Sequence, residues 1–127
     1  MLSLILSFLL ASSVLGYSST EQLTESETRS LLLVAGWSVE VIPEAVEVIY
    51  CESRRIPSRI GDDGRAKGLL QIHWVLPEGT WGGWRWVPEM HKLRNRDIMS
   101  PLVNLRAGLV IYNNFGGWDA WSCKPTQ

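Results

Sequence analysis

Hydrophobic and polar residues follow helical spacing in three segments of this 127-residue chain. The first segment opens at Thr24, which is suited to cap a helix, and Glu27 can return a hydrogen bond to that cap. We expect the apolar run Leu31 to Val34 to face the core. Gly36 ends the pattern, because glycine accepts the left-handed conformation common at helix C-termini. The sequence therefore predicts a first helix between Thr24 and Gly36.

A second helix is predicted to begin at Pro43, since proline suits the first turn of a helix. Glu52 lies seven residues after Ala45, two turns on and nearly on the same face. Glu52 therefore belongs to the inward stripe, where a carboxyl group is either paired structurally or functional. Partial desolvation and the negative end of the helix dipole both favour a raised pKa there, as a general acid requires. The inward positions are Ile42, Ala45, Val46, Ile49 and, at the margin, Tyr50, and the outward positions are Glu40, Glu44 and Glu47.

The third segment starts at Ser100-Pro101, a cap followed by a first-turn proline, and ends at Gly116-Gly117. Residues 54–67 and 77–89 lack periodicity, whereas a short helix is expected over residues 71–75. The sequence allows at most a small β-hairpin near residues 59–69. These elements predict a mainly α fold of the α+β kind, a compact helical domain. The inner face of the third helix is marked by Leu102, Leu105, Leu109 and Tyr112.

Residues 1–16 have the pattern of a secretory signal peptide. A short apolar run from Leu2 to Leu10 is followed by small residues before Tyr17, and the run is too short to span a bilayer. The segment lacks the usual Lys or Arg, so a buried N-terminal helix and, after it, an uncleaved anchor are the alternative interpretations. We predict a signal peptide over 1–16, one domain over 17–127, and secretion to the extracellular space.

The chain carries 12 basic and 13 acidic residues, and its net charge of −1 is unchanged when residues 1–16 are removed. No basic tract is long enough to indicate binding to nucleic acid or to an anionic membrane. The two cysteines and two histidines lack the spacing of a metal site. We therefore expect no metal, no cofactor, no nucleic-acid partner, no membrane partner after signal cleavage, and a monomer.

The even pair of cysteines, Cys51 and Cys123, favours one disulfide bond in an exported chain. The bond would close a loop of about 73 residues, worth roughly 4 kcal/mol in the chain-entropy model. Two unpaired buried thiols are the alternative and would fit a cytosolic chain. We predict the disulfide, which would tether the C-terminal tail beside the helix end that carries Glu52.

Short motifs between Leu23 and Cys123 follow one another in an order typical of a known superfamily. They are Ala35-Gly36-Trp37, Cys51-Glu52-Ser53, Pro57, Gly61-Asp62-Asp63-Gly64, Gly68-Leu69-Leu70-Gln71-Ile72, Asn104-Leu105-Arg106-Ala107, Gly117-Trp118 and Trp121-Ser122-Cys123. The stretch resembles the small transglycosylase domains of the lysozyme-like superfamily, related to soluble lytic transglycosylases and goose-type lysozymes. The resemblance implies a mostly helical fold with a glycan-binding cleft.

The resemblance also implies that Glu52 is the essential acid, which protonates the glycosidic oxygen between N-acetylmuramic acid and N-acetylglucosamine in peptidoglycan. In the transglycosylase route the same carboxylate then acts as base while the C6 hydroxyl of the sugar attacks. In the goose-type route water attacks, helped by acidic residues elsewhere in the cleft. Asp62 and Asp63 are candidates for such a second carboxylate. A Gly-Asp-Asp-Gly loop is also a common turn, which is the interpretation we favour.

Other candidate substrate-binding residues each have a structural alternative. Gln71 matches the substrate-contacting glutamine of the family, or it is a buried amide that supports its loop. Tyr112 is either a cleft-lining residue or a core phenol. Ser53 either orients Glu52 or is an ordinary helix hydroxyl, and His73 is expected to be a hydrogen-bonding residue of the loop.

Seven tryptophans are many for a chain of this length. Trp74 and Trp84 lie in or before a Gly-rich stretch, where indoles could stack on sugar rings, although burial over the core is the alternative. Core positions are expected for Trp37, Trp118 and Trp121. The sequence as a whole predicts a peptidoglycan glycosidase whose partners are glycan strands. A non-catalytic, secreted carbohydrate-binding protein on the same fold is the alternative.

Overall fold

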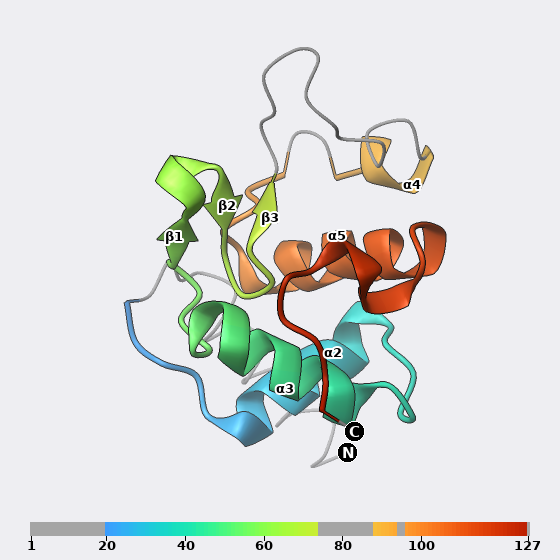
Figure 1. Cartoon of the computed structure of the whole chain (residues 1–127), viewed down its shortest axis with the longest axis horizontal. Helices are drawn as coiled ribbons and strands as arrows, with labels where there is room; N and C mark the ends of the chain where they lie inside the picture. Colours follow the sequence, from blue (N-terminus) through green and yellow to red (C-terminus); the bar gives the residue numbers. More distant parts are fainter. Residues whose placement is uncertain (1–19, 74–87, 94–95, 127) are drawn as a thin grey trace, which may run out of the picture.

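The computed structural model describes residues 20–73, 88–93 and 96–126. The predicted signal peptide and the segment with Trp74 and Trp84 lie outside these ranges, so what was expected of them stays a prediction. Figure 1 shows α2 packed with α3 and α5, and a small sheet near the C-terminal end of α3. In chain order the elements are α2 (Glu25–Ala35), α3 (Ile42–Ser53), β1 (Ile60–Gly61), the 3-10 helix η1 (Asp62–Gly64), β2 (Ala66–Lys67), β3 (Ile72–His73), α4 (Pro88–His91), α5 (Pro101–Asn114) and the 3-10 helix η3 (Gly117–Ala120).

Helix α2 begins with the predicted capping box. The Glu27 main-chain N–H donates to Thr24 Oγ1 at 3.0 Å, and the Thr24 N–H donates to Glu27 Oε1 at 2.9 Å. The helix ends at Gly36, whose φ of 102° is left-handed. The expectation that the whole apolar run faces inward is wrong for Leu33 and Val34, which are 53% and 49% exposed. A helix turns by about 100° per residue, so four consecutive side chains do not share one face.

Helix α3 carries Pro43 in its first turn, as predicted, and buries Ala45 and Ile49. Tyr50 is not on the inner face, because it is 42% exposed. Its ring instead contacts the guanidinium of Arg54, which lies 4.6 Å from the ring centroid. Tyr50 therefore lies outside the inward stripe, which continues to the half-buried Glu52 and the buried Ser53.

The three strands form one antiparallel sheet in the order β1-β2-β3. The first two strands make the hairpin that the sequence allowed near residues 59–69. The third pairs Ile72 with Lys67, so the helix predicted over residues 71–75 is wrong at residues 72–73. A two-residue strand is too short to show any periodicity, and only its pairing with β2 defines it.

Helix α5 starts at Pro101, as predicted, and packs on α2. Between α2 and α3, Trp37 donates from Nε1 to the Leu105 carbonyl at 2.9 Å and stacks on Trp118, with ring centroids 5.4 Å apart. Trp37, Trp118 and Trp121 are all buried, which confirms their predicted core positions.

The fold is therefore mixed: helices combined with a small three-stranded antiparallel sheet. This agrees with the α+β class, but the sheet exceeds the single hairpin expected from the sequence. Within the described residues, none of the helices has the length and apolar character needed to cross a membrane.

Candidate active site

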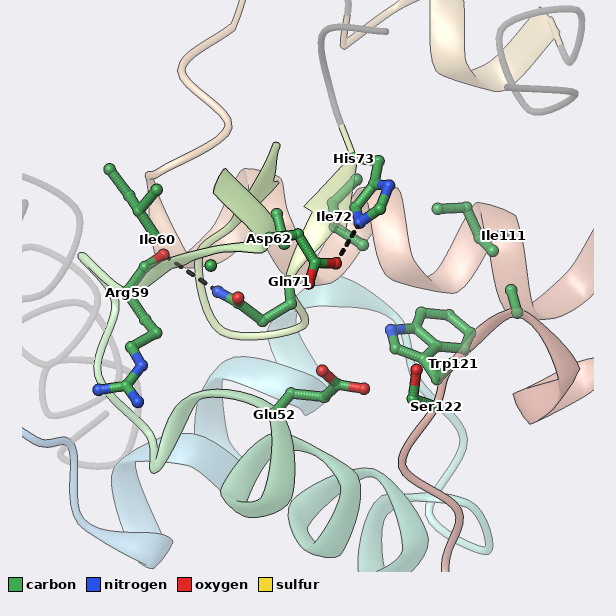
Figure 2. Close-up of a pocket in the computed structure, with 13 residues that line it drawn as sticks. Glu52, Arg59, Ile60, Asp62, Gln71, Ile72, His73, Ile111, Trp121 and Ser122 are labelled. Carbon is green, nitrogen blue, oxygen red and sulfur yellow. Dashed lines mark hydrogen bonds and ion pairs between the residues drawn. The ribbon is translucent and has the colours of Figure 1, made fainter. Parts of the chain in front are cut away.

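A pocket of about 560 Å³ lies between the last turn of α3, the sheet and the segment that follows η3 (Figure 2). This volume falls in the usual range for small-ligand sites. Figure 2 shows the Glu52 carboxylate pointing into the space between α3 and the sheet. Within the described parts of the chain, no group of three His, Cys, Asp or Glu side chains is arranged to hold a metal ion. The polar lining includes Glu52, Arg59, Asp62, Gln71, His73 and Ser122.

Glu52 is half-buried, and its Oε2 accepts a hydrogen bond from the Cys123 main-chain N–H at 3.3 Å. Burial raises the pKa of Glu52 above its ordinary value of 4.5, and the negative charge of Asp62 adds to the rise. The Cys123 hydrogen bond and the charges of His73 and Lys124 lower the pKa, but burial is the largest effect. The upward direction predicted from the inward position of Glu52 is therefore confirmed.

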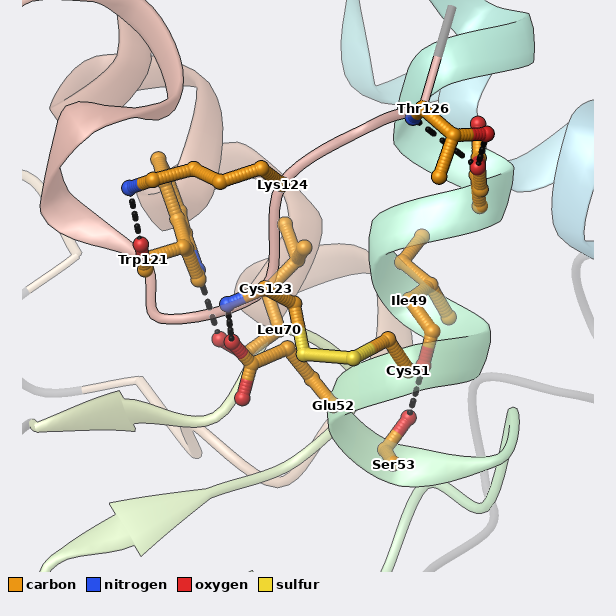
Figure 3. The surroundings of a disulfide bond; sticks show 10 residues. Ile49, Cys51, Glu52, Ser53, Leu70, Trp121, Cys123, Lys124 and Thr126 are labelled. Carbon is orange, nitrogen blue, oxygen red and sulfur yellow. Dashed lines mark hydrogen bonds between the residues drawn. A yellow bond between two sulfur atoms is a disulfide. The ribbon is translucent and has the colours of Figure 1, made fainter.

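The predicted disulfide is present between Cys51 and Cys123, whose Cα atoms lie 6.1 Å apart (Figure 3). It fastens the C-terminal tail to α3 one residue before Glu52. Further along the tail, the Thr126 main-chain N–H donates to Glu47 Oε1 at 3.0 Å. The tail is thus attached to α3 at two points, which keeps the Cys123 amide against Glu52.

Trp121 and Ser122, which lie between η3 and the disulfide, form one wall of the pocket. Trp121 donates from Nε1 to the Leu70 carbonyl at 2.8 Å, which joins this wall to the turn between β2 and β3. Lys124 Nζ donates to the Trp118 carbonyl at 2.9 Å and also to that of Trp121. Hydrogen bonds to main-chain carbonyls therefore fix the wall.

Asn104 of α5 holds the turn between β2 and β3. Its Oδ1 accepts from the Leu70 N–H at 2.8 Å, and its Nδ2 donates to the carbonyls of Lys67 at 2.8 Å and Ile98 at 3.0 Å. Gly68 has a φ of +79°, and a Cβ there would lie 2.2 Å from Asn104 Nδ2. The turn therefore requires glycine at this position, because no side chain fits beside the asparagine.

Gln71 follows this turn with a left-handed φ of 51°. Its Nε2 donates to the carbonyls of Arg59 at 3.1 Å and Gly68 at 2.9 Å. A Cβ at Gly61 would lie 2.6 Å from Gln71 Oε1. The loop-supporting role is therefore present. Gln71 also lines the pocket, so substrate contact by the same side chain stays a prediction.

Asp62 and Asp63 occupy η1 with positive φ values of 48° and 56°, which confirms that they form the turn. Only Asp62 lines the pocket with Glu52. Its Oδ2 lies 3.0 Å from His73 Nε2, so His73 is the loop hydrogen-bonding residue that the sequence predicted. Of the two candidates for a second carboxylate, the structure brings Asp62 to the site of Glu52, whereas Asp63 is not among the lining residues.

Tyr112 lies in an aromatic cluster, with its ring centroid 5.4 Å from that of Trp37 and 4.9 Å from that of Trp118. It is not among the residues that line the pocket, so its contacts are those of a core phenol. Ser53 is buried and donates from Oγ to the Ile49 carbonyl at 3.0 Å, the contact of an ordinary helix hydroxyl. Trp74 and Trp84 lie outside the described residues.

Sequence reasoning missed two features of the pocket: the Cys123 main-chain N–H at Glu52 and the side chain of Arg59. A main-chain donor leaves no signal in a sequence. Arg59 does precede the glycine-rich turn of the motif region, but an arginine in a loop is usually a solvated surface residue. Comparison with family models, with curated proteins and with solved structures found no match to this chain.

Proposed function

We propose that this protein cleaves the β-1,4 bond between N-acetylmuramic acid and N-acetylglucosamine in peptidoglycan, with Glu52 as the general acid. The single observation that carries the proposal is a half-buried carboxyl group with a raised pKa, aimed into a pocket. Acids with shifted pKa values in clefts are characteristic of acid–base catalysis. The lysozyme-like motif order in the sequence supplies the substrate class.

In the first step, protonated Glu52 gives its proton to the glycosidic oxygen as the bond to the anomeric carbon breaks. The leaving sugar departs with a hydroxyl group, and Glu52 becomes a carboxylate. That carboxylate then takes a proton from the attacking group, which forms the new bond to the anomeric carbon and restores the acid. A positioned group of this kind accelerates the reaction by about 10² to 10⁴.

The attacking group distinguishes two routes. Attack by the sugar's own C6 hydroxyl gives an anhydro product and needs one carboxylate. Attack by water gives a reducing sugar, and a second carboxylate can take the proton of the water in place of Glu52. Proton exchange with the solvent then returns the second carboxyl to its charged form and Glu52 to its protonated form. Asp62 is the candidate for that role, since it shares the pocket with Glu52 and His73 holds its Oδ2.

The lysis of purified bacterial cell walls tests the proposal. Wild-type protein is expected to clear a wall suspension, Glu52→Gln to bind the wall without clearing it, and Glu40→Gln to act as wild type. Glu40 is a matched control, because it is an exposed glutamate outside the pocket lining. Mass spectrometry of the released fragments identifies the route, as anhydro and hydrated products differ by one water.

Two results would contradict the proposal. Full activity in Glu52→Gln would remove Glu52 from the mechanism. Wall binding without cleavage by the wild type would favour the non-catalytic carbohydrate-binding protein instead. We further propose that the protein acts outside the cell, a location with which its disulfide is compatible.

A further inference from the structure

Arg59 is a charged residue of the pocket that the proposed cleavage does not use. It lines the pocket together with Glu52, and its main-chain carbonyl accepts from the Gly68 N–H at 2.9 Å and from Gln71 Nε2 at 3.1 Å. Its side chain is exposed, and among the described residues its guanidinium forms no ion pair. The backbone of Arg59 is therefore fixed, while its cationic group is left available to a ligand.

The segment of sequence that contains Arg59 is more basic than the chain as a whole. Residues 54–67 contain five basic and two acidic side chains, although the net charge of the protein is −1. Of the two acids, Asp62 already bonds His73 through Oδ2, and Asp63 is outside the pocket lining. Among the described residues, no carboxylate, Glu52 included, forms an ion pair with the Arg59 guanidinium.

The position of Arg59 relative to the proposed acid limits what it can touch. Figure 2 shows its guanidinium on one side of the Glu52 carboxylate and Ser122 on the other. An extended ligand that lies across Glu52 in this direction meets a cation at the Arg59 end. A guanidinium is suited to a carboxylate, because it offers two parallel N–H donors to the two oxygens.

We propose that Arg59 binds a carboxylate on the side arm of N-acetylmuramic acid and thereby selects peptidoglycan over uncharged glycans such as chitin. This inference rests on the proposed function. The side arm begins with a lactyl group, which ends in a carboxylate when it is free and in an amide when it carries a peptide. In the second case the peptide supplies the carboxylates. Chitin strands contain neither group.

Binding to the uncleaving Glu52→Gln protein tests the inference by calorimetry with three ligands: a chitooligosaccharide, a peptide-free muramyl oligosaccharide, and the same oligosaccharide with its peptides. Adding Arg59→Ala is expected to weaken the binding of at least one acidic ligand about tenfold, the scale of an exposed charge-assisted contact. The affinity for the chitooligosaccharide should not change. Salt should weaken the binding of the acidic ligand more in the protein that keeps Arg59 than in the one that carries Arg59→Ala.

Two further variants separate the contact from a general effect of charge. Arg59→Lys should recover part of the lost affinity, since lysine keeps the charge but not the paired donors. Arg106→Ala removes the same charge from an exposed position of α5 outside the pocket lining, and it should leave all three affinities unchanged.

The acidic ligand whose binding Arg59→Ala weakens shows whether the carboxylate belongs to the lactyl group or to the peptide. Equal weakening of all three ligands by Arg59→Ala, or no weakening of any, would overturn the role of Arg59 while leaving the proposed function intact. If Glu52→Gln binds none of the three ligands, the proposed function fails and the inference fails with it.

Discussion

Asn104 is the residue whose replacement tests most directly how the pocket is held. It is fully buried on α5, and its amide joins three main-chain groups: the Leu70 N–H and the carbonyls of Lys67 and Ile98. Asn104→Ala removes all three hydrogen bonds at once. The turn that carries Gln71 into the pocket would then lose its hydrogen bonds to the Asn104 side chain of α5.

The magnitude follows from these contacts. Three hydrogen bonds contribute about 1 kcal/mol each, and an unpaired buried N–H at Leu70 adds a desolvation cost of about 1–2 kcal/mol. We therefore expect Asn104→Ala to lower the free energy of unfolding by about 4–5 kcal/mol. Asn114→Ala is the matched control on the same helix. Its Nδ2 makes one exposed hydrogen bond, to the Val110 carbonyl, so its effect should stay within about 0.5 kcal/mol.

Gly68→Ala tests the same contact from the other side. Its new Cβ would lie 2.2 Å from Asn104 Nδ2 at a left-handed φ, so the conformational part alone should cost about 1–2 kcal/mol. In the Asn104→Ala background the clash is absent, and Gly68→Ala should cost less than in the wild type. Urea denaturation of the four proteins measures both effects. A loss below about 1 kcal/mol for Asn104→Ala, or equal costs of Gly68→Ala in both backgrounds, would refute the reasoning.

Two further predictions concern the disulfide and the acid. The Cys51–Cys123 bond joins positions 72 residues apart, so its removal should lower the free energy of unfolding by about 4 kcal/mol. Denaturation of the double Cys→Ala variant measures this loss, and a loss under about 1 kcal/mol would contradict the prediction. For the proposed cleavage, kcat/KM should fall as pH rises through the pKa of Glu52, with a midpoint above 4.5, because Glu52 must carry its proton to act as the acid. Asp62→Asn should move this midpoint to lower pH, since the charge of Asp62 raises the pKa, and Asp63→Asn should not; an upward shift in Asp62→Asn would count against the assignment.

Local rules predicted the starts of α2, α3 and α5 and the end of α2, because these depend on residues that are neighbours in the chain. Helix α5 ends at Asn114, before the predicted Gly116-Gly117. The capping box of Thr24 and Glu27 and the left-handed Gly36 needed no tertiary information. The inward position of Glu52 followed from helical phase alone. Leu33 and Val34 were misjudged because the whole apolar run was assigned to one face, when helical phase turns half of it to solvent.

Tertiary contacts decided what the sequence left open. Strand β3 exists through its pairing with β2, so no local pattern marks it. Asp62 and Asp63 are equivalent in sequence, and only the backbone path of η1 sends one of them to the pocket. The Asn104 contacts join residues up to 37 positions apart. The sequence therefore showed the motif that contains Asn104, but not that its side chain holds the turn between β2 and β3.

The raised pKa of Glu52 links its proposed role as the acid to the stability of the fold, and this separates two explanations for an inactive variant. The pKa in the folded protein exceeds the ordinary value of 4.5, so the folded state binds this proton more tightly than the unfolded state. The resulting stabilisation is fully present below pH 4.5 and is lost as pH rises through the folded pKa. Glutamine has no charge to desolvate, and its side-chain oxygen can still accept from the Cys123 N–H. Glu52→Gln should therefore lose cleavage and, near neutral pH, unfold at a higher temperature than the wild type. A variant that is inactive and also less stable than the wild type would have lost the fold of the pocket, and its inactivity would say nothing about the acid.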